Sequence, residues 1–264
     1  GDTAMSIAQK AVEANGYTQT GMDSGYVTEI NGLSASDGGS QSGWMGTLND
    51  WFTSSGLDSF YVSDGDVVKF MYTSNGYGED LGGSWSNNDK TLKSLTVNTG
   101  RLDKEFSSDV TEYTLTVPYD TECIRVTPTA SNKNFQTRIY KNASVEEDEV
   151  RGPQITGEAA YEGELNGSKK NTTDLTEKFG FYKRTQDIPV SDGDVITVGC
   201  GLAGWATMNA QAGGTSDSEK GQIYKINIKF EDTAEFSPSD ELYSVTVKAA
   251  PSDANVRFYT NTGF

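Results

Sequence analysis

Residues 92–130 read LKSLTVNTGRLDKEFSSDVTEYTLTVPYDTECIRVTPTA, and this stretch decides the fold class. Apolar and polar residues alternate in its runs LKSLTV, TEYTLTV and ECIRVTPT, as they do in half-buried β-strands. The same alternation returns downstream in TRIY, VITVGC and IYKINIKF. Six such runs joined by polar turns, with no helical pattern between them, predict an antiparallel β-sandwich over residues 89–231.

One long polar stretch interrupts these strands. It lies at 141–181 and contains the acidic run Glu146, Glu147, Asp148 and Glu149 and the basic pair Lys169-Lys170. A stretch of this composition predicts a large insertion on the surface of the sandwich.

A repeat extends the pattern beyond the sandwich. Phe106-Ser107 followed by YTLTV at 113–117 is echoed, with the same spacing, by Phe236-Ser237 followed by YSVTV at 243–247. Because the interval matches the length of a sandwich domain, residues 232–264 are predicted to be the truncated start of a third β domain.

The first 88 residues follow a different pattern. Residues 2–15 carry an apolar stripe at helical spacing, with Asp2 or Thr3 as a cap and Asn15-Gly16 as a stop; its members are Ala4, Ile7, Ala8, Ala11 and Val12. Strand-like runs follow at 25–32, 43–52 and 59–73. One helix on a small twisted sheet is an α+β domain. The whole chain is therefore predicted to be mainly β, with an α+β domain at 1–88.

Composition narrows the classes of function. The chain has 264 residues, a formal net charge of −17 and no histidine, so it repels phosphate backbones and cannot form a Ser-His-Asp, Cys-His or His-bearing zinc site. Neither GxxxxGK[ST] nor a strand-to-helix GxGxxG occurs, and no run nears the ~18–20 apolar residues of a membrane span. We expect no enzyme activity, no nucleic-acid partner and no membrane insertion.

The first domain is rich in aromatic residues, and those beside glycine and asparagine are the ones expected at its surface. Exposed rings flanked by amides suit a sugar ring or a planar ligand, whereas packing in the core is the alternative for each ring. The predicted ligand-binding residues are Trp44, Asn49, Trp51, Tyr77 and Trp85. We expect no catalytic residue, metal site or cofactor.

Two further features leave alternatives open. The sequence VSDGDV occurs at 62–67 and at 190–195, and it predicts a tight turn with Gly65 or Gly193 at positive φ, the alternative being a calcium loop. Cys123 and Cys200 form a disulfide if their Cα atoms approach within about 7 Å, and otherwise are small buried hydrophobic residues.

Residues 1–88 contain a set of motifs at fixed places, which are Asn31-Gly32-Leu33, Ser42-Gly43-Trp44-Met45, Asn49, Trp51 and Asp64-Gly65-Asp66. With these motifs the stretch resembles the small domain related to the C-terminal domain of transcobalamin and intrinsic factor, which also occurs in bacterial surface proteins. The resemblance implies a β-grasp-like fold with an N-terminal helix, and cobalamin binding as one alternative function. This stretch lacks the opening hairpin usual in that family.

Residues 91–231 are similar to the bacterial cadherin-like β-sandwich repeat. The matching residues are Leu92, Leu95, Val97, Gly100, Phe106, Ser107, Tyr113, Val117 and Pro118. The resemblance implies a spacer or adhesive domain of an exported, multidomain protein of the Gram-positive cell surface. The long 141–181 insertion and Trp205 depart from the repeat.

Together these patterns predict a non-catalytic, extracellular, monomeric segment of a bacterial surface protein. Ligand binding or adhesion through surface aromatics is the first hypothesis, with a glycan, a small molecule or a host surface protein as partner. A purely structural spacer is the alternative.

Overall fold

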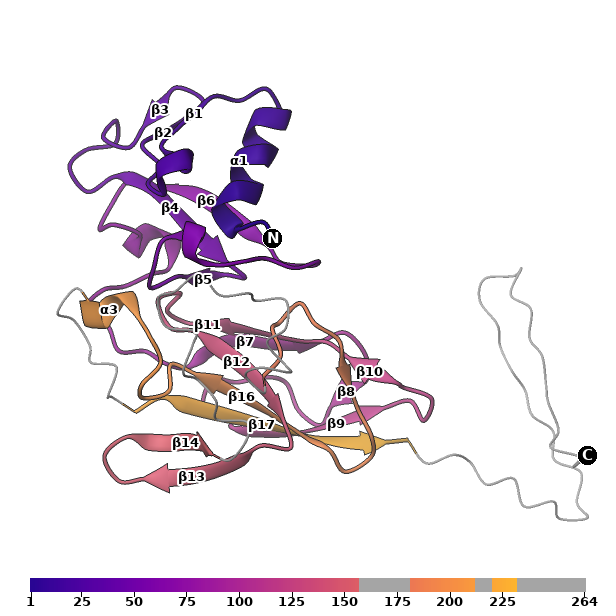
Figure 1. Cartoon of the computed structure of the whole chain (residues 1–264). Coiled ribbons are helices and arrows are strands. Elements are labelled where there is room, and N and C mark those ends of the chain that lie inside the picture. Colours follow the sequence, from indigo (N-terminus) through magenta and orange to yellow (C-terminus); the bar gives the residue numbers. More distant parts are fainter. Residues whose placement is uncertain (157–180, 212–219, 232–264) are drawn as a thin grey trace, which may run out of the picture. The chain divides into compact units, whose positions relative to one another are not determined.

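The computed structural model describes residues 1–156, 181–211 and 220–231. Residues 1–231 belong to one compact unit in which an α+β domain precedes a β-sandwich (Figure 1). The expected third domain, 232–264, lies outside the described residues, so its fold remains a prediction.

The first domain opens with helix α1, Ala4–Ala14. The Thr3 side chain accepts a hydrogen bond from the Ser6 backbone N–H, and the Ser6 side chain accepts one from the Thr3 N–H, which caps the helix start. The predicted helix is therefore confirmed, but its predicted apolar stripe is partly wrong. Met5 is buried, whereas Ile7 is 38% exposed, because the face beginning at Ala4 and Met5 turns toward the sheet.

Short strands and 3₁₀ helices build the rest of this domain. They are β1 (Gln19–Thr20), η1 (Met22–Ser24), β2 (Glu29–Ile30), β3 (Leu33–Ser34), β4 (Gly43–Leu48), β5 (Trp51–Phe52), η2 (Leu57–Ser59), β6 (Val68–Thr73) and η3 (Glu79–Leu81). Strands β5-β4-β6 form one antiparallel sheet and β1-β2-β3 another. Asn49 and Asp50, both at positive φ, make the two-residue turn between β4 and β5. Helix α1 covers the β4–β6 sheet through a core that includes Ala4, Met5, Leu48 and Phe60.

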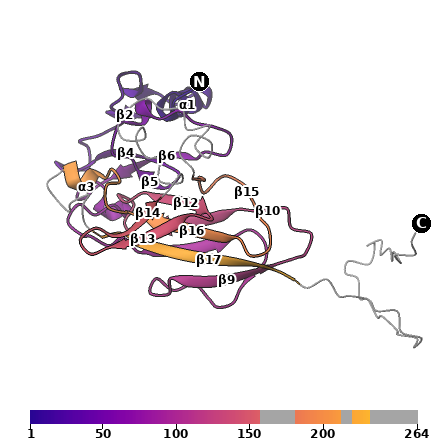
Figure 2. The same ribbon diagram turned by 60° about the horizontal axis from the view of Figure 1, so that its bottom comes forward.

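The second domain is a two-layer sandwich (Figure 2). Its strands are β7 (Leu92–Val97), β8 (Arg101–Leu102), β9 (Glu112–Val117), β10 (Cys123–Ile124), β11 (Val126–Ala130), β12 (Thr137–Lys141), β13 (Ser144–Asp148), β14 (Gly152–Thr156), β15 (Ile188–Pro189), β16 (Val195–Cys200) and β17 (Gln222–Phe230). One sheet has the order β12-β16-β17-β9-β8, and β7 pairs with β11 in the other layer. All six predicted strand runs are confirmed. The described pairs of this domain are antiparallel except β9 with β17, which run parallel.

A tyrosine explains the Phe-Ser-x5-Tyr pattern. The Tyr113 hydroxyl donates to the Ser107 carbonyl at 3.0 Å and accepts from the Ser107 N–H at 2.9 Å. Its ring stacks on Phe106 with 5.9 Å between centroids. The pattern therefore fixes the chain where it enters β9, beside a core shared by both layers.

The 141–181 stretch is only partly described. Its first part folds as the antiparallel hairpin β13–β14, which carries the acidic run at its exposed tip. The remainder, with Lys169-Lys170, lies outside the described residues.

The two cysteines are not joined. Cys123 and Cys200 are both free thiols, the first exposed and the second buried, so the disulfide alternative is wrong and the alternative of two buried residues holds for Cys200 alone. Strand β10, which carries Cys123, pairs with β15, while Cys200 ends β16 in the five-stranded sheet. Burial raises the pKa of the Cys200 thiol to about 12.

Candidate functional site

Trp51 lies where the first domain contacts the second. Its indole Nε1 donates to the Asn134 carbonyl at 3.2 Å, and its ring meets Phe60 edge-on at 5.8 Å between centroids. Only 9% of Trp51 is exposed. The expectation that this ring reaches the surface is therefore wrong, because the ring packs in the core of its own domain and its Nε1 bonds to the second domain.

Asn49 is the second predicted residue at this contact, and it stabilises the 62–67 turn through hydrogen bonds. Its Nδ2 donates to Asp66 Oδ1 at 2.9 Å, and its Oδ1 accepts from the Val67 N–H at 2.9 Å. Asp66 also accepts from the Ser63 N–H at 2.9 Å. Gly65 has a φ of 87°, so the VSDGDV segment is the predicted tight turn.

That turn holds a buried ion pair between the two domains. Lys183 Nζ of the second domain lies 2.7 Å from Asp66 Oδ2, and the two side chains are 7% and 1% exposed. The Thr185 hydroxyl donates to Asp66 Oδ1 at 3.4 Å. A buried charge pair needs such surrounding hydrogen bonds to offset its desolvation.

A cluster of amides makes a second junction. The Ser84 carbonyl accepts from the Nδ2 groups of Asn132 at 2.8 Å, Asn134 at 3.0 Å and Asn209 at 2.9 Å. Asn134 also donates to Asn209 Oδ1 at 2.6 Å. Because all three asparagines are buried, this network fixes the end of the first domain on the second.

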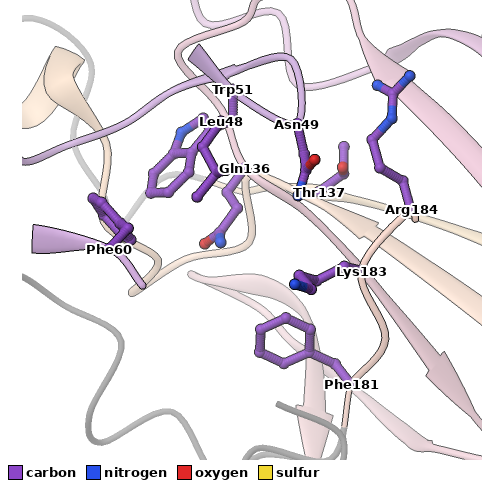
Figure 3. A pocket seen from close by; sticks show the side chains of 9 residues that line it. All are labelled: Leu48, Asn49, Trp51, Phe60, Gln136, Thr137, Phe181, Lys183 and Arg184. Carbon is purple, nitrogen blue, oxygen red and sulfur yellow. The ribbon is translucent and has the colours of Figure 1, made fainter. Parts of the chain in front are cut away.

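A small cavity lies between these junctions (Figure 3). Trp51 and Phe60 line it from the first domain, and Gln136, Phe181 and Lys183 from the second. Its volume is about 60 Å³, far below the ~300 Å³ at which ligand pockets begin. The cavity has room for a water molecule or two but not for a glycan.

A larger groove lies on the first domain. Its volume is about 440 Å³, and its apolar lining includes Met5, Trp44, Met45, Phe52, Leu57 and Phe70. Residues of the 25–27 and 53–56 segments, Gly46 and Met208 also line it. None of the described lining residues carries a charge at neutral pH.

Trp44 is the predicted residue that lines this groove. Its Nε1 donates to the Leu33 carbonyl at 2.9 Å, and Tyr72 packs against it at 5.3 Å between centroids in an edge-on arrangement. The ring is half-buried. Its hydrogen bond and packing hold the ring in one orientation while part of it stays open to a ligand.

Gly46 keeps this groove wall closely packed. A Cβ at this position would lie 2.5 Å from Leu57 Cδ1 and 3.1 Å from a Phe70 ring carbon. Only glycine lets β4 approach these side chains so closely.

Tyr77 and Trp85 lie in a different part of the domain. Trp85 Nε1 donates to the Tyr77 carbonyl at 3.0 Å, and the Tyr77 hydroxyl donates to the Ser40 carbonyl at 3.1 Å. The loop between them is held by Asp80, whose pKa is lowered by a hydrogen bond from the Thr73 hydroxyl, against the opposing effect of desolvation, and by backbone and side-chain bonds from Ser74. The five predicted residues therefore fall into three places.

The comparisons with known proteins agree with the division into two domains. A family model described as a domain of unknown function (DUF4430), a transcobalamin-like family, matches residues 1–74. A model described as a cadherin-like beta sandwich domain matches residues 92–229, which is more than half of the chain. The chain belongs to the cadherin-like beta sandwich family. No curated protein and no solved structure gave a match.

Domains of these two families fit a non-catalytic surface or structural segment. In the described parts of the chain, no group of three or more Cys, Asp or Glu side chains is placed to hold a metal ion. None of the described helices is both long and apolar enough to cross a bilayer.

Sequence reasoning missed the contacts between the DUF4430 domain and the cadherin-like domain. Lys183, Asn134 and Asn209 had no local pattern that marked them. The one available signal was GLAGWATMN, 201–209, which departs from the cadherin-like repeat and carries Asn209 at its end.

Proposed function

We propose that this chain is a non-catalytic segment of an exported bacterial surface protein, and that its first domain binds an uncharged ligand in the groove beside Trp44. The observation that carries the proposal is the groove itself. Its volume of about 440 Å³ falls within the ~300–1,000 Å³ of small-molecule sites, and its apolar, aromatic lining is usual for them.

Charge supports an uncharged ligand. The chain has a formal net charge of −17, so its field repels anions. The described lining offers no Lys or Arg to bind an anion and no Asp or Glu to bind a cation. A neutral molecule with an apolar ring face, such as a neutral glycan or a planar small molecule, matches this surface.

The experiment compares Trp44→Ala with Trp85→Phe. Each variant is titrated with neutral oligosaccharides, with cyanocobalamin and with the neutral dye Nile red, and binding is followed by calorimetry or by dye fluorescence. Loss of a ring that contacts the ligand weakens binding about tenfold or more. Trp85→Phe, outside the groove, is expected to bind as the wild type does.

The panel also separates the ligand classes. Saturable binding of oligosaccharides supports a glycan site, and saturable binding of Nile red or cyanocobalamin supports a planar small-molecule site. If no probe binds the wild type, or if Trp44→Ala binds as well as the wild type, the groove is not the site.

A structural spacer is the second candidate, and the buried Asp66–Lys183 pair favours it. Two domains joined by a buried ion pair and a buried amide cluster transmit force as one body. A single narrow distance distribution between spin labels on the two domains, together with no ligand binding, would support the spacer. A broad distribution would count against it.

A further inference from the structure

The helix α3, Met208–Gln211, brings the second domain to the groove of the first. Met208 lines the groove together with Trp44, Met45 and Phe70. Among the described lining residues it alone comes from the cadherin-like domain. Both views place α3 beside the first domain, close to β5 (Figures 1 and 2).

The residues on either side of Met208 are held in place by hydrogen bonds. The Thr207 hydroxyl donates to the Asn134 carbonyl at 3.1 Å. Asn209 Nδ2 donates to the carbonyls of Ser84 at 2.9 Å and Asn87 at 3.2 Å, and both belong to the segment that leaves the first domain. Thr207 and Asn209 are 4% and 0% exposed.

Met208 itself is half-buried. Its backbone is therefore fixed while its side chain stays partly open at the groove. A thioether on a flexible stem adapts to ring-shaped apolar ligands and makes favourable contacts with aromatic faces.

We propose that the groove is a composite site in which the cadherin-like domain supplies Met208 as a ligand-contacting residue. This inference rests on the proposed function of the groove and adds that affinity depends on the second domain. The ligand class is an uncharged molecule with an apolar ring, long enough to reach from Trp44 to Met208.

The experiment titrates the full chain with Nile red. We expect Met208→Ala to weaken binding about three- to tenfold, because apolar contact area is lost. Met208→Lys is expected to weaken it further, since an ammonium group would be desolvated by the ligand. Met208→Leu, of similar volume, should stay within about twofold of the wild type.

A charge control comes from the acidic hairpin. Val150 is 76% exposed and is not among the described residues that line the groove, so Val150→Lys changes the net charge equally and should leave binding unchanged. Each variant is checked by thermal unfolding, and Met208→Lys reports on the site if Met208→Ala unfolds.

The outcomes separate this inference from the proposed function. If Trp44→Ala loses binding but Met208→Ala and Met208→Lys bind as the wild type, the composite site is overturned and the groove remains the site. If the wild type shows no saturable binding of Nile red, both are overturned. An equal loss in Met208→Lys and Val150→Lys also overturns the composite site, since net charge alone would explain it.

Discussion

Replacing Lys183 with methionine removes the charge that neutralises Asp66 at the contact between the two domains. Asp66 is 1% exposed, and leaving a buried charge without its partner costs roughly 3–5 kcal/mol. The carboxylate keeps hydrogen bonds from Asn49, Ser63 and Thr185, which offset part of this cost. We therefore expect the free energy of unfolding to fall by about 2–4 kcal/mol.

Urea unfolding, followed by tryptophan fluorescence and by circular dichroism, measures this loss. Trp51 lies at the contact between the domains, so its fluorescence reports on the first domain leaving the second. In Lys183→Met the first domain is expected to unfold at lower urea than the sandwich. The double variant Asp66→Asn/Lys183→Met should be less destabilised than Lys183→Met alone, because no unpaired charge remains.

An exposed ion pair supplies the matched control. Arg125 and Asp187 lie 2.8 Å apart with side chains 46% and 52% exposed, and such pairs contribute about 0–1 kcal/mol. The reasoning is refuted if Lys183→Met is no more destabilising than Arg125→Met, or if the double variant is as unstable as Lys183→Met.

Three further predictions concern the sandwich. Tyr113→Phe removes both hydrogen bonds to Ser107 and is expected to lower the free energy of unfolding by about 1–2 kcal/mol in urea, whereas Tyr119→Phe, at a position 63% exposed, should change nothing. A thiol reagent should label Cys123 and spare Cys200 in the folded protein, and Cys123→Ser should abolish labelling until the chain unfolds. Burial raises the pKa of the Cys200 thiol from 9.0 to about 12, so the unfolded chain loses this proton at a lower pH than the folded chain. The free energy of unfolding is therefore unaffected by this thiol below about pH 9 and falls as the pH rises toward 12. Cys200→Ala should lose stability less steeply over that range, and equal slopes would contradict the assignment.

The elements predictable from the sequence are those specified by local patterns. Helix α1 has its cap at Thr3, and the sandwich strands β7, β9 and β11 alternate between buried and less buried residues, so spacing alone identified them. Hairpin β13–β14 lies within the predicted surface insertion, and its strands could not be predicted because four of the five residues of β13 are exposed and show no alternation of buried and exposed positions. The parallel pairing of β9 with β17 joins the start and end of the domain, and no local signal records it.

The candidate site was less predictable because exposure depends on the neighbouring domain. Trp44 and Trp51 both lie in one aromatic stretch, yet Trp51 is buried and bonds to Asn134, 83 residues away. Met208 reaches the groove from the second domain. Composition points to aromatic rings as a class, and their binding of a ligand stays a prediction; it could not tell which of these rings would be buried in the fold.

The two VSDGDV turns show how a repeated sequence motif could help to predict a contact between domains. In the first, Ser63 N–H and Asn49 Nδ2 donate to the two oxygens of Asp66, and Asn49 Oδ1 accepts from Val67 N–H, all at 2.9 Å. Asn49 has a φ of 52°. The turn and an asparagine from the neighbouring strand end therefore form one hydrogen-bonded unit.

The second turn repeats this unit. Ser191 N–H and Asn142 Nδ2 donate to the two oxygens of Asp194, and Asn142 Oδ1 accepts from Val195 N–H, all at 2.8 Å. Asn142 has a φ of 53°. The equivalence is not visible from VSDGDV alone, since each asparagine lies at a different distance along the chain.

The two units differ in which domain supplies the lysine that pairs with the aspartate. In the sandwich, Lys141 directly precedes the asparagine and its Nζ lies 3.5 Å from Asp194 Oδ2, so the domain supplies its own cation. In the first domain the equivalent position is Leu48, and the carboxylate of Asp66 instead receives Lys183 from the second domain. The same turn thus pairs with a lysine of its own domain where lysine precedes the asparagine, and with a lysine of the other domain where leucine stands at that position.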